Sequence, residues 1–129
     1  NGISYFRYLN VVNDANKKIV VLTDNDNNNA KIEESTNYNN EHQNQHIFLD
    51  VNTGNWTWEK CFYALNQQAL DSLIEVEENA NYLFHKKDYG KVLGKMLNNK
   101  VDTAYIMLNS GIDFEIPQYI QDAIKWLNE

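Results

Sequence analysis

The most marked feature of the hydropathy pattern is a short apolar run that ends abruptly in acidic and amide residues. Residues 19–23 read IVVLT without polar alternation, and Asp24, Asn25 and Asp26 follow at once. A run of this length and composition predicts a strand buried on both faces, as in a parallel sheet covered by helices. Ligands of open α/β sheets bind beyond the carboxyl ends of the strands. We therefore expect the function to centre on the residues after this strand.

Patterns on either side of this strand indicate an α/β arrangement. Residues 3–15 carry apolar side chains at helical spacing, which predicts an amphipathic helix before the strand. Residues 27–45 are rich in Asn and other polar types, and they predict a mobile loop with one short helix. Residues 46–51, HIFLDV, predict a second strand, which is followed by a turn at residues 52–55. Two strands with helical segments around them are typical of an α/β layer.

The second half of the chain is predicted to be mainly helical. Thr57 is a candidate N-cap for a helix with Trp58, Cys61, Phe62 and Leu65 on one stripe, and Glu59 then lies in its first turn. Further helices are predicted over residues 68–81, 87–98, 101–110 and 117–128. We expect one domain-sized chain with an α/β part at residues 1–56, which holds the acidic motif, and a mainly helical part at residues 57–129.

Composition and charge limit the classes of function. The 129 residues have a formal net charge of -7 and a pI near 4.9, which argues against binding to nucleic acid by this piece alone. The sequence has no apolar run long enough to cross a bilayer and no leader pattern, so we expect a protein with no membrane contact. A single cysteine, Cys61, fits a reducing cytoplasm. The chain begins with Asn and opens on a helical pattern, so we expect it to be part of a longer protein.

The Asp-x-Asp motif at Asp24 and Asp26 suits three kinds of chemistry. An EF-hand calcium loop beginning at Asp24 needs Gly at its sixth position and Glu at its twelfth, where this chain has Asn29 and Ser35. A phosphatase of the haloacid dehalogenase class would use the first Asp as nucleophile, but it has Thr two residues after the second Asp, where this chain has Asn28. That class remains the less favoured alternative.

The third kind of chemistry is phosphodiester cleavage with two metal ions. Two carboxylates spaced i, i+2 at a strand end can bind Mg²⁺ or Mn²⁺, and further acids hold a second ion. Glu59 follows the second predicted strand as Asp24 follows the first, so we expect both acids at one edge of the sheet. This pattern predicts a metal site made of Asp24, Asp26 and Glu59.

Four stretches of the chain resemble one family in the same order. Residues 1–26, NGISYFRYLNVVNDANKKIVVLTDND, are similar to the segment that leads into the Asp-x-Asp motif in the Toprim domain of OLD (overcoming lysogenization defect) family nucleases. Thr57, Trp58 and Glu59 stand in the place of that family's T-x-E element. The other two stretches match its lysine-containing segment and its C-terminal motif: Lys86, Lys87, Asp88, Tyr89, Gly90; Phe114, Ile116, Pro117, Tyr119, Ile120, Ala123, Ile124.

The resemblance implies a metal-dependent DNA endonuclease domain, joined in the family to an ABC-type ATPase domain and associated with DNA processing and phage defence. By carry-over, Asp24, Asp26 and Glu59 would bind Mg²⁺ or Mn²⁺, and Lys86 or Lys87 would stabilise charge on the scissile phosphate. ATP would bind only to the ATPase domain, which this chain does not include. We expect the complete protein to be a cytoplasmic homo-oligomer that acts on DNA.

The chain departs from the family pattern in one respect. The family's domain begins with a strand that ends in V-E-G-x-x-E, whose glutamates supply metal ligands, and no such element occurs here. We therefore expect a partial Toprim-like Rossmannoid fold: a small parallel sheet without its first strand, an exposed sheet edge, flanking helices and a helical C-terminal half. The two-metal site would be incomplete and this piece alone inactive. The alternative is a non-catalytic Toprim-like module that supports an ATPase or a protein partner.

Overall fold

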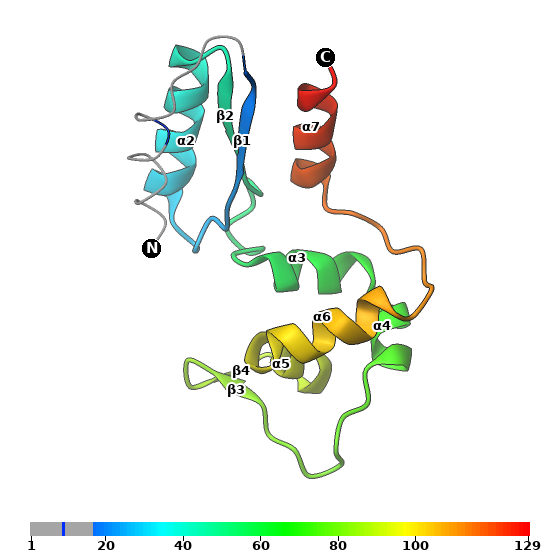
Figure 1. Ribbon diagram of the computed structural model, residues 1–129. Helices are drawn as coiled ribbons and strands as arrows, with labels where there is room; N and C mark the ends of the chain where they lie inside the picture. The colour runs from blue at the N-terminus through cyan, green and yellow to red at the C-terminus, as the bar shows by residue number, and fades with distance from the viewer. Residues whose placement is uncertain (1–8, 10–16) are drawn as a thin grey trace. The chain divides into compact units, whose positions relative to one another are not determined.

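The chain forms two compact units in the computed structural model, which describes Leu9 and residues 17–129 (Figure 1). The first unit comprises Asn1–Thr57 and Pro117–Glu129, and the second comprises Trp58–Ile116. The helix predicted over residues 3–15 lies outside the described residues except for Leu9, which is fully buried. The predicted change from α/β to mainly helical structure after residue 56 falls one residue from the unit boundary, but the last helix returns to the first unit.

The first unit is built on a parallel β-α-β arrangement. Strand β1 (Ile19–Leu22) and strand β2 (Gln45–Phe48) pair in parallel, with helix α2 (Asn29–Glu41) between them in the sequence. The register places Ile19 beside Gln45 and Leu22 beside Phe48. Because the strands are parallel, the loops that follow them, residues 23–28 and 49–56, emerge at the same edge. We call these segments the β1 loop and the β2 loop.

Helix α2 fills most of residues 27–45, for which the sequence predicted a mobile loop with one short helix, so that prediction underestimated the helix. Asn28 caps the helix, and its Oδ1 accepts hydrogen bonds from the backbone N–H groups of Ala30, at 2.9 Å, and Lys31, at 3.3 Å. The face of α2 toward β2 is polar: the Asn39 amide bonds to both the N–H (2.7 Å) and the carbonyl (2.8 Å) of Ile47. Asn39 thereby takes the place of a neighbouring strand at the outer edge of β2. The sequence hid this helix because hydrogen bonds, rather than an apolar stripe, attach it.

Helix α7 (Gln118–Leu127) packs on both strands and lies across them from α2 (Figure 1). Its residues match the predicted helix 117–128, with Pro117 at the N-cap. The Trp126 ring stacks on His46 of β2, with centroids 4.3 Å apart. Lys18, just before β1, caps the C-terminal end of α7: its ammonium donates to the carbonyls of Trp126, at 2.7 Å, and Glu129, at 3.1 Å. These contacts fix the tail of the chain against the sheet.

The prediction that the first strand is buried on both faces is wrong. Ile19, Val20 and Val21 are half-buried and Leu22 is 51% exposed, whereas Ile47 of β2 is only 3% exposed. The reason is the arrangement of the described helices, since α7 packs on β1 but α2 packs on β2 instead. An uninterrupted apolar run therefore marks the strand correctly without proving cover on both sides.

The second unit is mainly helical. Its elements are α3 (Trp58–Leu65), α4 (Gln67–Leu73), a hairpin of β3 (Leu83–Phe84) and β4 (Lys87–Asp88), α5 (Lys91–Asn98) and α6 (Lys100–Leu108). Five buried side chains form its core: Phe62, Leu70, Ile74, Met96 and Met107. Partly buried apolar residues surround them, among them Trp58, whose ring stacks on Phe62 at 4.7 Å. This unit is therefore held by apolar burial.

Two helix predictions in the second unit are too long. The helix expected over residues 68–81 ends at Leu73, and the acidic segment after it is extended because Lys95 and Lys91 donate to the carbonyls of Glu75 and Glu78, each at 2.5 Å. The helix expected over residues 87–98 begins only at Lys91. Gly90, with φ of 89°, stands at its N-cap in a conformation that other residues rarely adopt. The segment before Gly90 forms the hairpin instead.

The fold class is mixed α/β, as the sequence predicts, with a small parallel sheet and a helical second unit. The helix predicted over residues 101–110 corresponds to α6, and Glu59 lies in the first turn of α3 as expected. Within residues 17–129, none of the helices combines the length and the apolar character needed to cross a membrane.

Close packing at Gly94 generates a stability prediction for the second unit. A Cβ on Gly94 would lie 2.5 Å from the carbonyl oxygen of Tyr82 and 2.8 Å from its Cβ. We expect Gly94→Ala to lower the free energy of unfolding by about 1–3 kcal/mol, although Ala is the better helix former by about 1 kcal/mol. Urea denaturation measures the change, with the exposed Glu34→Ala as a control that should move by about 0.5 kcal/mol or less. A more stable Gly94→Ala protein would contradict the close approach.

Candidate functional site

The acidic motif lies at the carboxyl end of β1, in the β1 loop. The N–H of Thr23 donates to the Phe48 carbonyl at 3.2 Å, so strand pairing continues to the residue before Asp24. Asp24 is half-buried, and the side chain of Asp26 is 59% exposed. The strand therefore delivers two carboxylates, spaced i, i+2, to the sheet edge at which α/β proteins bind ligands.

Asn25, between the two acids, joins the β1 loop to the β2 loop. It is only 1% exposed, and its Nδ2 donates to the carbonyls of Asp50 (2.8 Å), Asn52 (2.9 Å) and Asn55 (3.3 Å). Its Oδ1 accepts from the N–H of Asn27 at 2.8 Å. One buried amide thus satisfies carbonyls of one loop and an N–H of the other. Sequence analysis did not single out Asn25, because one Asn in an Asn-rich stretch carries no distinguishing signal.

The backbone of the β1 loop adopts a left-handed conformation at two consecutive residues. Asp26 and Asn27 both have φ of 55°, a region that Asp and Asn tolerate better than most residues. The N–H of Asp26 donates to the carbonyl of Trp56 at 3.2 Å, and the N–H of Asn28 donates to the carbonyl of Asn25 at 3.0 Å. The loop conformation is thus determined by bonds at both ends and across to the β2 loop.

Two further side chains govern the charge at this edge. Lys31, in the first turn of α2, forms an ion pair with Asp26 at 2.9 Å, and the lysine side chain is only 13% exposed. The carboxylate of Asp50 accepts from the N–H of Asn52 at 2.8 Å and from Nδ2 of Asn55 at 3.1 Å. Asp50 therefore orders the β2 loop, whereas Asp26 has Lys31 as a cationic partner.

Glu59 lies in the second unit and has its own ion pair. Its Oε1 is 3.4 Å from the ammonium of Lys100, and its side chain is 14% exposed. Asp24 and Asp26 belong to the first unit, so the convergence of the three carboxylates stays a prediction. Among the residues that the structure describes, no group of three or more His, Cys, Asp or Glu side chains could hold a metal ion.

Lys86 and Lys87 lie in the β3–β4 hairpin rather than at the helix start that the sequence predicted. His85 and Lys86 form its two-residue turn, with φ of 49° and 66°, and both lysines are exposed. Lys87 pairs across the hairpin with Phe84. The two candidate lysines therefore project from a small basic hairpin.

The chemistry of the acids at the β1 loop fits a hard divalent cation. Carboxylate oxygens are the ligands that Mg²⁺ and Mn²⁺ prefer, and Mg²⁺ is commonly bound by only one or two carboxylates, with water and phosphate oxygens completing its shell. Asp24 and Asp26 would supply this pair. A metal bound there would polarise a phosphate oxygen and activate water.

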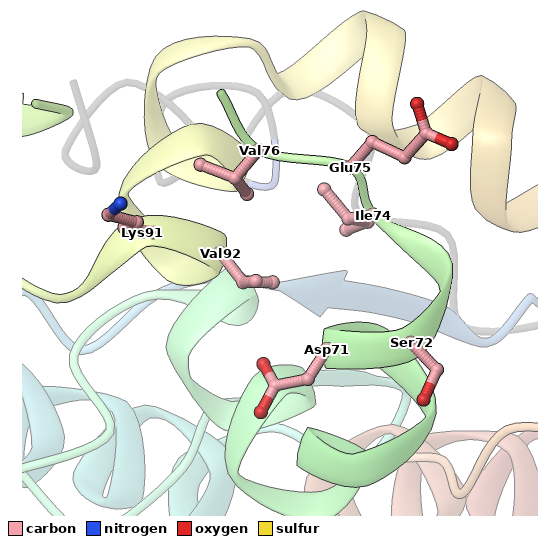
Figure 2. Close-up of a pocket in the computed structure, with 7 residues that line it drawn as sticks. All are labelled: Asp71, Ser72, Ile74, Glu75, Val76, Lys91 and Val92. Atoms are coloured by element: carbon pink, nitrogen blue, oxygen red, sulfur yellow. The ribbon is translucent and has the colours of Figure 1, made fainter. Parts of the chain in front are cut away.

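The second unit also contains a hollow of about 530 Å³ beside α4 and α5 (Figure 2). Figure 2 shows Ile74, Val76 and Val92 lining it, with Asp71 and Ser72 contributed by α4. The Asp71 carboxylate accepts a hydrogen bond from the Tyr63 hydroxyl at 2.7 Å. Partial burial and this bond raise the pKa of Tyr63 to about 12. The hydrogen bond between Tyr63 and Asp71 joins α3 to α4, so we interpret the polar lining of this hollow as part of the packing of the unit.

Comparison of the chain with protein-family models, with curated proteins and with solved structures found no match. The functional argument therefore depends on the residues and their geometry.

Replacing Asn25 tests its role in joining the two loops. In Asn25→Asp the shape and the acceptor to Asn27 persist, but a carboxylate oxygen would face three carbonyls in place of the Nδ2 donor. We expect the free energy of unfolding to fall by about 2–4 kcal/mol, because three carbonyls lose their donor and a charge takes the place of a buried neutral amide. Urea denaturation measures this fall, and Asn40→Asp on the exposed side of α2 is the matched control. Equal stability of the two variants would exclude the proposed role of Asn25.

The raised pKa of Tyr63 predicts a pH-dependent contribution to stability. The pKa of Tyr63 in the folded protein, about 12, exceeds the ordinary value of 10.0. The contribution of the protonated Tyr63 hydroxyl to the free energy of unfolding is therefore complete below pH 10 and is lost as pH rises to about 12. In Tyr63→Phe this loss should be absent, so the stability difference between the two proteins should shrink across that interval. Urea denaturation at several pH values measures it, and ultraviolet titration of tyrosinate checks the pKa. A difference that is constant with pH would contradict the assignment.

Proposed function

We propose that this chain is the nuclease part of a metal-dependent DNA endonuclease of the OLD type. Asp24 and Asp26 would bind Mg²⁺ or Mn²⁺ at the end of β1, and Glu59 would hold a second ion in the complete site. Lys86 or Lys87 would stabilise the scissile phosphate. The complete protein would carry an ABC-type ATPase domain, form a homo-oligomer and act on DNA in the cytoplasm.

The observation that carries this proposal is the construction of the β1 loop. A parallel β-α-β unit presents Asp24 and Asp26 at its carboxyl edge, and Asn25 fixes both loops of that edge through four hydrogen bonds. Such pre-organisation is what a metal site needs, because its ligands must keep their positions while the substrate changes. A simple solvated turn would need no buried amide between its two acids.

Reaction at such a site follows from elementary electrostatics. Metal ions held by Asp24 and Asp26 would offset the charge of a phosphodiester, activate water for in-line attack and stabilise the leaving oxygen. A lysine ammonium near the same phosphate would stabilise its developing negative charge. The Lys31 ammonium neutralises Asp26 before metal binds, so metal uptake would release Lys31 from this ion pair.

One observation favours the alternative, a non-catalytic Toprim-like module. Asp26 is paired with Lys31, and Glu59 is paired with Lys100, so both acids have cationic partners without any metal. A module that supports an ATPase or a protein partner needs no more than such pairs. The phosphatase reading is weaker, because Asn28, in place of the Thr of that class, caps α2.

Metal binding by the full chain separates these readings. We expect Mn²⁺ to bind, measured by its electron paramagnetic resonance signal, and Asp26→Asn to weaken this binding at least about tenfold. Lys31→Met should strengthen it about two- to fivefold, because an ion pair whose carboxylate is largely exposed competes with the metal by about 1 kcal/mol or less. The control is Asp122→Asn on the solvent-exposed face of α7, which should leave Mn²⁺ affinity unchanged. Absence of Mn²⁺ binding, or binding indifferent to Asp26, would support the module.

Nicking of supercoiled plasmid then tests catalysis. The assay uses the longer protein that the resemblance implies, with Mg²⁺ or Mn²⁺, because the upstream glutamates of the family are not part of this chain. Asp24→Asn and Asp26→Asn should each abolish metal-dependent nicking, and Asp122→Asn should not. Equal nicking by all variants would place the activity elsewhere.

A further inference from the structure

The lysines of the second unit divide into two groups. This unit has six lysines and no arginine. Lys91 and Lys95 donate to backbone carbonyls of the acidic segment after α4. The other four lie in or beside the β3–β4 hairpin: Lys60, Lys86, Lys87 and Lys100. A chain with a net charge of -7 therefore concentrates positive charge around one short element.

The hairpin combines these cations with aromatic rings. Phe84 and Lys87 are cross-strand partners and so lie on the same face. The Lys100 ammonium is 5.9 Å from the centroid of the Phe84 ring, and the His85 ring meets Phe84 edge-on at 4.2 Å. At the base of the hairpin, the Lys60 ammonium is 5.7 Å from the Tyr89 ring.

The acids nearest this face have partners of their own. Glu59 forms the ion pair with Lys100, and the Asp88 carboxylate accepts from the N–H of Gly90 at 2.9 Å. Asp88 pairs with Leu83, so it lies on the opposite face from Phe84. Within residues 17–129, the ammonium groups of Lys86 and Lys87 form no ion pair or hydrogen bond, and both side chains are exposed. These two charges remain available to an anion.

The hairpin turn is not built from the residues that best suit its backbone. A two-residue turn with positive φ at both positions favours Asn-Gly, yet this chain places His85 and Lys86 there, at φ of 49° and 66°. Bulky residues in this region are strained, and such strain is concentrated at functional sites. The presence of His and Lys where Asn-Gly is preferred is consistent with a use for their side chains.

We propose that the β3–β4 hairpin binds the phosphate backbone of DNA, with Lys86 and Lys87 on phosphates and the Phe84 ring against sugar or base. The aromatic ring beside exposed lysines favours nucleic acid over an acidic protein, because it adds a stacking surface to the charges. The choice of DNA as the ligand rests on the proposed function. The new element is that both Lys86 and Lys87 bind phosphates of the DNA backbone at the surface of the hairpin. Such binding needs no metal.

The test measures binding of a fluorescently labelled DNA duplex to the full chain by anisotropy, at low salt and with EDTA. We expect Lys86→Gln combined with Lys87→Gln to weaken binding about tenfold or more. The slope of log affinity against log salt should fall by about 2, since two phosphate contacts are lost. Lys125→Gln on the solvent-exposed face of α7 is the matched control, and it should change neither the affinity nor the salt slope. No DNA binding by the unaltered chain, or equal binding by the double variant, would overturn the proposal.

A second variant separates loss of charge from loss of folding. His85→Asn with Lys86→Gly installs the preferred turn, so we expect its Tm to rise by a few degrees while DNA binding weakens. Unchanged DNA binding by this more stable protein would contradict the role of the tip. Polyglutamate serves as a competitor: if it displaces DNA at equal charge concentration, the partner is an acidic protein and the DNA assignment is wrong.

The outcome is independent of the metal site. Mn²⁺ binding to the hairpin variants should equal that of the unaltered chain, because these variants alter none of the proposed metal ligands Asp24, Asp26 and Glu59. If Mn²⁺ does not bind but the hairpin variants lose DNA affinity, the hairpin proposal stands and the nuclease proposal fails. If Mn²⁺ binds and the hairpin variants keep full DNA affinity, the hairpin proposal fails and the nuclease proposal stands.

Discussion

The buried amide of Asn25 is the contact on which the arrangement of the two strand-end loops depends. Its side chain donates to three carbonyls of the β2 loop and accepts an N–H of its own loop. Removing it would take the hydrogen-bond partner from three carbonyls and one N–H group, and a polar group left unpaired on burial costs about 1–3 kcal/mol. Asp24 and Asp26 flank this amide, so their positions follow from it. The geometry of the candidate metal site therefore depends on the hydrogen bonds of a neutral side chain.

The first unit shows how far hydrogen bonds can replace apolar contact in a small α/β layer. The Asn39 amide bonds to the backbone of Ile47 at the outer edge of β2. Gln45 donates to the Leu9 carbonyl at 3.0 Å, and Lys18 caps the C-terminal end of α7. The bonds of Asn39 satisfy strand groups that a larger sheet would pair with another strand, whereas Lys18 satisfies carbonyls at the end of a helix. The second unit has a larger aromatic and aliphatic core, centred on Phe62, Leu70 and Met96.

Both units carry acids and lysines. Asp24, Asp26 and Asp50 of the first unit lie at the strand ends, and Lys31 there pairs with Asp26. In the second unit, Lys91 and Lys95 stabilise the segment after α4, while Lys86 and Lys87 extend into solvent from a strained turn. This separation matters for the proposed binding of DNA, because local fields decide where a polyanion can approach. The proposed metal ligands and the proposed phosphate-binding lysines can then coexist in one chain of net charge -7.

The sequence by itself determined the features that depend on local pattern. The apolar run before Asp24 predicted β1, Pro117 and the apolar stripe after it predicted α7, and Glu59 was placed correctly in the first turn of α3. These signals are local because periodicity and caps act within one or two turns. The mixed α/β class followed from their order along the chain.

Only the tertiary structure decided the rest, because partners distant in the sequence supplied the energy. Helix α2 forms although its sequence is polar, since β2 provides the bonds that Asn39 needs. The predicted helix over residues 68–81 stops at Leu73 because lysines of α5 hold the following carbonyls. Asn25 acquires its importance from carbonyls 25 to 30 residues away. Pattern identifies which residues are acidic or apolar, whereas the partner that each one meets is a property of the folded chain.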